Sequence, residues 1–423
     1  MIGSKPGLAF ISPVFLFPND AGGKIRTTNI LRGMKGGAFH ISLVSVATLE
    51  QTQRWAADID SVCDRFISWE PAAKRPKWLR AIDLFNLLPV NVKADRTSSG
   101  MTAVARISKS PEIDIIVFDF VHSAVLCPAH LPCNSVCFTH NVEAEIFRRH
   151  ADKAKDPFKR WVWNSQCRKM ECFEREALGL FTTVVAVSER DARFFSDSYR
   201  ISDVQAIPTG VDLGYFGWHE PPPVSVASPP TVVFTGSMDW AANIDGVQFF
   251  LKEVWPLILT VRVQARFVIV GRNPPAALVA LARSMKNVEL TGFVDDVRPY
   301  VHAAHVFVIP LLVGGGTRIK AFEAMAMGCP IVSTSIGTEG LGAEPEVHFL
   351  EHDGARQMAD AVLQLFRDPE LRLAISVRAR QLVDQQFGHQ VAARAFEKIC
   401  LHALSQGRRN PQEVAEFTGL EQG

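Results

Sequence analysis

One stretch of the sequence, HVFVIPLLVGGGTRIKAFEAMAMGCPIVSTSIGTEGL at residues 305–341, decides how the rest of the chain is interpreted. An apolar run predicts a buried strand ending at Pro310, three glycines follow, and Thr317 is suited to cap a helix that begins near Arg318. Glycines let backbone N–H groups approach a ligand, and a helix N-terminus favours an anion. Arg318 and Lys320 add positive charge within one turn. The stretch therefore predicts a phosphate site whose backbone cradle is Gly314, Gly315, Gly316 and Thr317.

A carboxylate follows on the same expected helix. Glu323 lies three residues after Lys320, and a carboxylate there can accept hydrogen bonds from both hydroxyls of a ribose. The alternative is an ion pair along the helix face with Arg318 or Lys320. Phosphate charge and a ribose acceptor together indicate a nucleotide.

The rest of the chain alternates short apolar runs with helical patterns, which is typical of parallel sheets covered on both faces. We therefore expect an α/β fold with two doubly wound, Rossmann-like domains whose strand ends face a shared cleft. The expected strands are residues 8–16, 40–47, 113–118, 135–139, 183–187, 204–207, 231–235, 265–270, 287–290, 305–310 and 330–333. The expected helices include residues 25–35, 142–150, 156–180, 245–260, 318–327 and 355–366.

A proline-rich segment marks the boundary between the two halves. Residues 220–230, EPPPVSVASPP, show no periodicity and are interpreted as a linker. The N-terminal domain is then residues 1–219 and the C-terminal domain residues 231–390. Residues 391–423 are expected to form a helix and a polar tail, with the helix packing back on the N-terminal domain.

Composition excludes several classes of protein. Lys and Arg total 45 and Asp and Glu 44, so the chain has no strong basic excess and nucleic acid is not an expected partner. Eight irregularly spaced cysteines form no disulfide framework and favour a reducing, cytoplasmic compartment. Residues 8–18 are apolar and resemble a weak signal segment, but Pro13 interrupts them and a buried strand is the better interpretation.

Six pieces of the chain together resemble the GT-B glycosyltransferases of family 4, also called group 1, and the resemblance covers nearly the whole length. It is strongest to bacterial exopolysaccharide-associated sugar transferases with a GGGTR motif. The pieces are GGKIRTTNILRGM, VVAVSERDARFF, IPTGVDLGYF, VVFTGSMDW, VELTGFVDDVRPYV and GGGTRIKAFEAMAMGCPIVST.

The resemblance implies a donor site for a nucleoside-diphosphate sugar. Glu323 matches the second of two family glutamates, which binds the ribose, and Gly315 occupies the position of the first. The family's Arg and Lys after the first C-terminal strand are also absent here, so Arg318 and Lys320 are expected to supply the diphosphate charge. The remaining expected donor contacts are Gly22, Gly23, Arg26, Gly236, Ser237 and Val294. A plain strand-to-helix turn is the alternative for Gly22 and Gly23.

The acceptor side is expected at strand ends of the N-terminal half. Asp119 stands where many relatives carry a His, and His122 follows three residues later. Asp119 is a candidate to orient a hydroxyl or act as a base, His122 is a candidate to replace it, and His140 resembles the family's acceptor-side His. Each of the three has a purely structural alternative. With Arg318 and Lys320 at the leaving group, they make up the expected catalytic set.

Weaker patterns carry other interpretations. Cys133, Cys137 and His140 have metal-like spacing but lack an evident fourth ligand, so no metal is expected. Asp58 and Asp60 end a helix-like stretch and are interpreted as surface residues. Three tryptophans, Trp78, Trp161 and Trp163, lie among basic residues and suit a membrane interface. The equal alternative is that the charges are solvated and the tryptophans belong to the core.

These observations predict a retaining hexosyltransferase that moves a sugar from a nucleoside-diphosphate sugar to a glycan or lipid-linked glycan, in exopolysaccharide or cell-surface polysaccharide synthesis. It would need no cofactor or metal, and would be cytoplasmic or peripheral on the inner-membrane surface. A nucleotide-sugar epimerase of the same fold and a non-catalytic sugar-nucleotide-binding protein are the alternatives.

Overall fold

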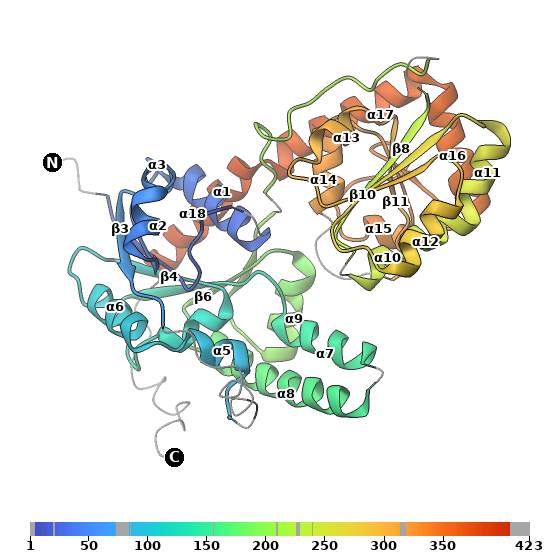
Figure 1. Ribbon diagram of the computed structural model, residues 1–423. Coiled ribbons are helices and arrows are strands. Elements are labelled where there is room, and N and C mark those ends of the chain that lie inside the picture. The colour runs from blue at the N-terminus through green and yellow to red at the C-terminus, as the bar shows by residue number, and fades with distance from the viewer. Residues whose placement is uncertain are drawn as a thin grey trace. The chain divides into compact units, whose positions relative to one another are not determined.

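The computed structural model describes residues 5–19, 22–72, 84, 86–154, 156–208, 210–225, 229–238, 240–313 and 319–406. The chain divides into two compact units (Figure 1). The N-terminal unit contains Met1–Gly210 and His389–Gly423, and the C-terminal unit contains Val211–Gly388. Each unit is built around a parallel sheet with helices on both faces, so the predicted α/β fold with two Rossmann-like domains is confirmed.

The N-terminal unit has a seven-stranded parallel sheet in the order β3-β2-β1-β4-β5-β6-β7. Its central strands β1, β4, β5 and β6 are buried along their whole length, which explains why their sequences are mostly apolar. The strands are β1 (Gly7–Ser12), β2 (His40–Val46), β3 (Arg65–Trp69), β4 (Ile115–Asp119), β5 (Asn134–Phe138), β6 (Thr183–Ala186) and β7 (Val204–Ala206).

Helices cover both faces of this sheet. Side chains of α1 and α18 pack with β1, β2 and β4 on one face, and side chains of α6, α8 and α9 pack on the other. The helices are α1 (Gly22–Met34), α2 (Leu49–Arg54), α3 (Ala56–Asp60), α5 (Val90–Asp95), α6 (Ser98–Ser108), the 3-10 helix η2 (Val121–Leu126), α7 (Glu143–Lys153), α8 (Pro157–Gly179), α9 (Glu189–Tyr199) and α18 (His389–Ser405). Asp58 and Asp60 lie in the short helix α3, as the sequence predicts.

The last helix of the described chain belongs to the N-terminal unit. Figure 1 shows α18, coloured red, beside the blue helix α1. A Cβ atom at Gly33 would lie 2.4 Å from the Cβ of Ala393, so glycine permits this close approach. The Glu397 carboxylate also accepts a hydrogen bond from the Ala38 amide at 2.6 Å.

The C-terminal unit has a six-stranded parallel sheet in the order β10-β9-β8-β11-β12-β13. Its strands are β8 (Thr231–Thr235), β9 (Arg266–Val270), β10 (Val288–Gly292), β11 (Val306–Ile309), β12 (Ile331–Ser333) and β13 (Leu350–Glu351). Its helices are α10 (Ala241–Phe249), the π-helices η3 (Phe250–Val254) and η4 (Val383–Phe387), α11 (Trp255–Val261), α12 (Ala276–Ser284), α13 (Arg298–His302), α14 (Ile319–Ala326), α15 (Ser335–Thr338), α16 (Ala355–Arg367) and α17 (Pro369–Leu382).

The described part of the proline-rich segment belongs to the C-terminal unit. Where the structure describes it, it lies against the C-terminal unit, and the division between units falls at residue 210, before the predicted boundary. The His219 amide donates to the Met327 carbonyl at 3.2 Å, and the buried Arg372 donates to the Pro222 carbonyl at 3.1 Å. Both hydrogen bonds are accepted by backbone carbonyls, so the side-chain pattern of the sequence does not indicate these contacts.

A search of the described residues finds no helix with the length and apolar character needed to cross a bilayer.

Candidate active site

The glycine-rich junction itself lies outside the described residues. This applies to Gly314, Gly315, Gly316, Thr317 and Arg318, so the predicted phosphate cradle stays a prediction. The structure does place its two flanks. Strand β11 precedes the junction and helix α14 follows it, which is the expected strand-to-helix connection.

Lys320 lies at the carboxyl end of β8, beside two residues predicted to bind the donor. Its Nζ donates to the Asn243 Oδ1 at 2.9 Å and lies 4.4 Å from the centre of the Phe234 ring. The Asn243 Nδ2 donates to the Ser237 carbonyl at 2.8 Å. A Cβ atom at Gly236 would lie 2.8 Å from both Lys320 Nζ and Asn243 Nδ2, so a side chain here would require these two groups to move. The structure therefore brings Gly236, Ser237 and Lys320 together.

Strand β9 contributes a second cation at the same edge. Arg272 Nε donates to the Ser237 Oγ at 3.3 Å, and the Met238 amide donates to the Arg272 carbonyl at 3.0 Å. The two strand ends approach so closely that a Cβ at Gly271 would lie 2.0 Å from the Gly236 carbonyl oxygen. Sequence reasoning missed Arg272 and Asn243. The Gly-Arg pair directly after the apolar run 265–270 was the available signal for Arg272.

Glu323 and Val294 are the other predicted donor contacts that the structure describes. Glu323 is half-buried on α14; burial raises the pKa of its carboxyl to about 7, and the charge of Lys320 opposes that shift. Val294 follows β10 and is also half-buried. Its neighbour Phe293 is 70% exposed and leaves an aromatic face at the carboxyl end of β10.

In the N-terminal unit, Asp119 is the centre of a buried polar network at the carboxyl end of β4. The side chain exposes no surface. Its carboxylate accepts from Thr27 Oγ1 at 3.0 and 3.1 Å, from Ser12 Oγ at 3.1 Å and from His140 Nε2 at 2.8 Å. Arg26 Nη1 lies 3.4 Å from the other ring nitrogen of His140. Strands β1, β4 and β5 and helix α1 thus bring Asp119, His140 and Arg26 together.

The protonation states of this network follow from its partners. Burial lowers the pKa of His140, so the ring is neutral at pH 7, donates from Nε2 to Asp119 and accepts from Arg26 at Nδ1. Burial also lowers the pKa of Arg26 to about 10, although the charges of Asp191 and Asp119 oppose the shift. Arg26 is therefore a cation whose charge is compensated by two carboxylates.

His122 lies in a second, more open layer above this network. Its Nδ1 forms a 2.6 Å hydrogen bond with Asp95, and 17% of the side chain is exposed. Burial acts to lower the pKa of His122, but the hydrogen bond and charge of Asp95 outweigh it and the pKa is raised. Burial raises the pKa of the nearby Glu143 carboxyl, and the charge of His122 opposes that shift. Asp95 gave no signal in the sequence.

Phe120 packs between the two layers and leaves no room for a side chain at Gly23. Its φ of 65° is unusual for a bulky residue, and its ring stacks on His140 at 4.0 Å and on His122 at 5.0 Å. A Cβ at Gly23 would lie 2.6 Å from this ring, whereas a Cβ at Gly22 would meet nothing within 4 Å. Both glycines lie in the first turn of α1 rather than in the loop that the sequence predicts.

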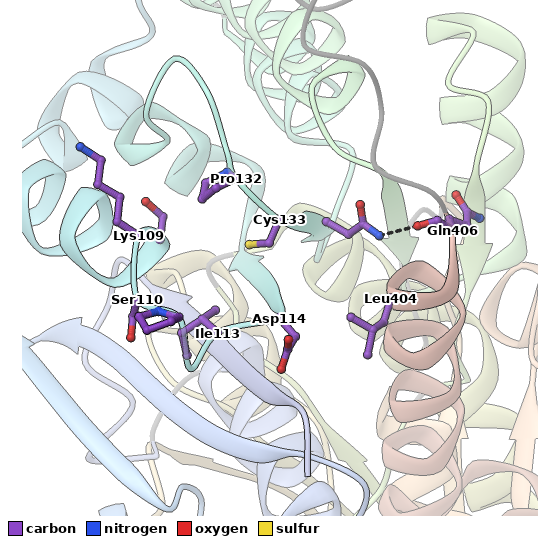
Figure 2. A pocket seen from close by; sticks show the side chains of 11 residues that line it. Lys109, Ser110, Ile113, Asp114, Pro132, Cys133, Leu404 and Gln406 are labelled. Atoms are coloured by element: carbon purple, nitrogen blue, oxygen red, sulfur yellow. Dashed lines mark hydrogen bonds between the residues drawn. The ribbon is translucent and has the colours of Figure 1, made fainter. Parts of the chain in front are cut away.

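A pocket of about 540 Å³ lies at the opposite, amino edge of the same sheet. Figure 2 shows it between the segments before β4 and β5 and the end of α18, with Lys109, Cys133 and Gln406 around it. The dashed line in the figure is the 2.7 Å bond from Asn134 Nδ2 to the Gln406 carbonyl. Open α/β sheets bind ligands at their carboxyl edges, so we place the candidate site at the edge that carries Asp119 and His122.

Comparisons with known proteins bear on the fold and on the C-terminal unit. The fold is that of GT-B glycosyltransferases. Residues 229–368, which include Gly236, Ser237, Val294, Lys320 and Glu323, match the family described as "Glycosyl transferases group 1".

Three individual proteins illustrate the similarity. A glycosyltransferase from Rickettsia africae ESF-5 has a TM-score of 0.64 at 14% identity, over 96% of this chain and 100% of its own. HepE from Anabaena, solved with UDP and glucose, has a TM-score of 0.61 at 12% identity, over 93% and 99%. A Klebsiella pneumoniae protein described as "Uncharacterized 44.6 kDa protein in cps region" is 25% identical over 137 residues, which are 29% of this chain and 35% of that protein. Together, the fold and the family match support a glycosyltransferase and sugar transfer.

Proposed function

We propose that this protein is a retaining, group 1 (family 4) hexosyltransferase that moves a sugar from a nucleoside-diphosphate sugar to a hydroxyl of a glycan or lipid-linked glycan. The observation that carries the proposal is the constellation of Lys320, Asn243 and Ser237 at the carboxyl end of β8. The three residues lie within the segment that matches the family, and Lys320 lies three residues after Thr317, the last residue of the predicted cradle.

The donor would bind along the carboxyl edge of the C-terminal sheet. Transfer breaks the bond between sugar C1 and a diphosphate oxygen, and the electron pair leaves on the diphosphate. Lys320, the predicted Gly314–Thr317 amides and Arg318 would stabilise this growing negative charge, which is electrostatic catalysis at the leaving group. Glu323 would accept the ribose hydroxyls.

The acceptor would bind at the carboxyl edge of the N-terminal sheet. Asp119 exposes no surface and His140 only 4%, so in this arrangement they hold the edge in place rather than touch a substrate. We assign the contact with the acceptor to His122, which reaches the surface and is oriented by Asp95. The acceptor oxygen forms the new bond to C1, and its proton passes to the departing diphosphate.

Support for a polysaccharide role and for a membrane surface comes from two separate observations. The description of the Klebsiella relative places it in a cps region, which favours exopolysaccharide or cell-surface polysaccharide synthesis.

At the start of α8, Phe158 and Trp161 are 69% and 57% exposed and stack at 6.0 Å, with Lys159 and Arg160 between them in sequence. Trp163 instead packs on His150 and Phe147, and Trp78 lies outside the described residues.

An exposed aromatic pair flanked by cations suits peripheral binding to an anionic bilayer. We expect wild-type protein to sediment with vesicles rich in phosphatidylglycerol more than with phosphatidylcholine vesicles. Replacing both Phe158 and Trp161 by alanine should reduce this binding, while Leu49→Ala, which removes another exposed apolar side chain from the same unit, should not. Equal sedimentation of all three proteins would refute the membrane assignment.

A thermal-shift screen of nucleoside-diphosphate sugars, followed by a donor hydrolysis assay, tests the proposed function. We expect stabilisation by one class of donor and slow release of the sugar without acceptor. Lys320→Met should reduce both. An isomerised donor would instead indicate the epimerase, and donor binding with no turnover under any acceptor condition would indicate a binding protein. No binding to any member of the panel would overturn the proposal.

A further inference from the structure

A fully buried carboxylate lies behind the acceptor-side edge, on helix α8. Glu174 exposes none of its surface. Its Oε1 accepts from the Glu143 amide at 2.7 Å, and its Oε2 accepts from the Ala144 amide at 3.1 Å and from Tyr199 Oη at 3.0 Å. Helices α7, α8 and α9 therefore meet at one side chain.

These bonds supply a cap that helix α7 does not make for itself. The first amides of a helix have no partner within the helix, and a Ser, Thr, Asp or Asn just before it usually supplies one. Here that residue is Val142, whose side chain makes no capping hydrogen bond. Glu174 serves the first two amides of α7 from a neighbouring helix, thirty-one residues further along the chain from Glu143.

The capped segment carries groups of the candidate site. α7 begins three residues after His140, which bonds to Asp119 and stacks on Phe120. Glu143, whose amide Glu174 holds, is also close enough for its charge to raise the pKa of His122. A shift of the first turn of α7 would therefore move both His140, which bonds to Asp119, and Glu143, which lies near His122.

We propose that Glu174 is a positioning residue of the acceptor-side edge: by holding the first turn of α7, its carboxylate keeps His140 on Asp119 and Glu143 beside His122. That this edge binds an acceptor rests on the proposed function, whereas the hydrogen bonds of Glu174 do not depend on that function. Glu174 touches none of the groups expected to contact substrate directly, so it acts through the segment 140–143.

The cost of burying this group is consistent with such a role. Burial raises the pKa of Glu174 to about 7, against the effect of the Ala144 and Glu143 amides, which favour the ionised form. A carboxyl whose folded pKa is raised loses stability as the pH rises from its ordinary value towards 7. A capping side chain at position 142 would serve α7 alone and would not tie it to α8 and α9.

The test uses the full-length protein with ¹⁵N-labelled histidine. In wild type, the His140 ring should show the Nε2–H tautomer and slow exchange of that proton. In Glu174→Gln, the new side-chain amide N–H faces a backbone N–H of α7, so one charge-assisted hydrogen bond is lost. The loss of one such bond changes an equilibrium constant by about tenfold. We therefore expect the His140 ring proton to exchange about ten times faster in this variant. Glu171→Gln is the matched control, because it makes the same change on the same helix at a residue paired on the surface with Arg148 and Arg175.

Two further measurements separate positioning from general loss of structure and from failure of the proposed function. Stabilisation of Glu174→Gln by a donor should equal that of wild type, because the predicted donor residues that the structure brings together, Gly236, Ser237 and Lys320, belong to the other unit. Once an acceptor is found, kcat should fall about tenfold while KM for the donor is unchanged. If wild type binds no donor, the proposed function fails, and the histidine spectra still report on Glu174.

Unchanged His140 signals in Glu174→Gln, or the same change in Glu171→Gln, would overturn the inference. If Glu174→Gln does not fold, Tyr199→Phe takes its place, because it removes only the 3.0 Å bond to Oε2. It should move the His140 signals in the same direction by a smaller amount, and an unaltered spectrum for this variant would overturn the inference as well.

Discussion

The substitution Gly23→Ala tests how tightly the aromatic and imidazole rings are packed at the N-terminal edge. A Cβ at this position would lie 2.6 Å from Phe120 Cζ and 3.0 Å from Cε1. The ring cannot simply turn away, because His140 covers one side at 4.0 Å and His122 stacks on it at 5.0 Å. The Phe120 backbone already has a φ of 65° and has little freedom to adjust.

The expected magnitude follows from two opposing effects. Inserting a methyl group into a packed site typically costs about 1–3 kcal/mol of the free energy of unfolding. Replacing glycine by alanine gains about 1 kcal/mol in a helix interior, and we expect a smaller gain at Gly23, which is the second residue of α1. We therefore expect Gly23→Ala to destabilise the protein by about 1–2 kcal/mol. Gly22→Ala, where a Cβ meets nothing within 4 Å, should be neutral or slightly stabilising.

Urea unfolding of both variants measures these values, with Phe120→Ala as the partner in a double-mutant cycle. Without the Phe120 ring, Gly23→Ala should lose its penalty and become neutral or stabilising. Equal free energies of unfolding for Gly22→Ala and Gly23→Ala would refute the packing argument. A full penalty for Gly23→Ala in the Phe120→Ala background would show that the strain comes from somewhere else.

Three further outcomes follow from the candidate site. Lys320→Met should weaken binding of a nucleoside diphosphate about tenfold or more by calorimetry, while Lys252→Met, an exposed lysine of the same unit, should not. Burial raises the pKa of Glu323 to about 7, and in the proposed role its carboxylate would accept the ribose hydroxyls best when ionised, so donor affinity should rise between pH 6 and 8 and Glu323→Gln should abolish this slope. Because the pKa of His122 is raised in the folded protein, His122 contributes to the free energy of unfolding below pH 6.5, and this contribution is lost as the pH rises through the pKa of the folded state. Asp95→Asn should remove this pH dependence, which urea unfolding across pH 5–9 measures.

The buried strands were the most predictable part of the fold. β1, β4, β5 and β6 are covered on both faces, so most of their residues are apolar and stand out in the sequence, although β5 begins with Asn134 and Ser135. The edge strand β3 was missed. Its sequence RFISW is only partly buried, and an exposed Arg65 and a half-exposed centre leave no such run.

The parts of the candidate site that sequence reasoning missed are contacts between distant residues. Asp95 meets His122 across 27 residues, and Asn243 meets Lys320 across 77. Each is an ordinary polar residue on a helix until another element is packed against it. Ser237 was easier to find, because the pair Gly236-Ser237 directly follows an apolar run in the sequence. Arg272 follows Gly271 in the same way and was missed.

The charges around Arg26 bear on which unit holds the anionic part of a donor. Arg26 is buried, donates to His140 and is flanked by Asp191 and Asp119, so a diphosphate approaching it would meet two carboxylates as well as one cation. Lys320 lies on the same sheet edge as the Arg272 cation, and one carboxylate, Glu323, lies close enough for the charge of Lys320 to oppose the rise in its pKa. Coulomb attraction acts on the sum of the nearby charges, so it favours Lys320 over Arg26 as the diphosphate contact. On this reasoning Arg26 belongs with His140 and Asp119 in supporting the acceptor-side edge, and Arg26→Lys should disturb the His140 ring signals more than it changes donor affinity.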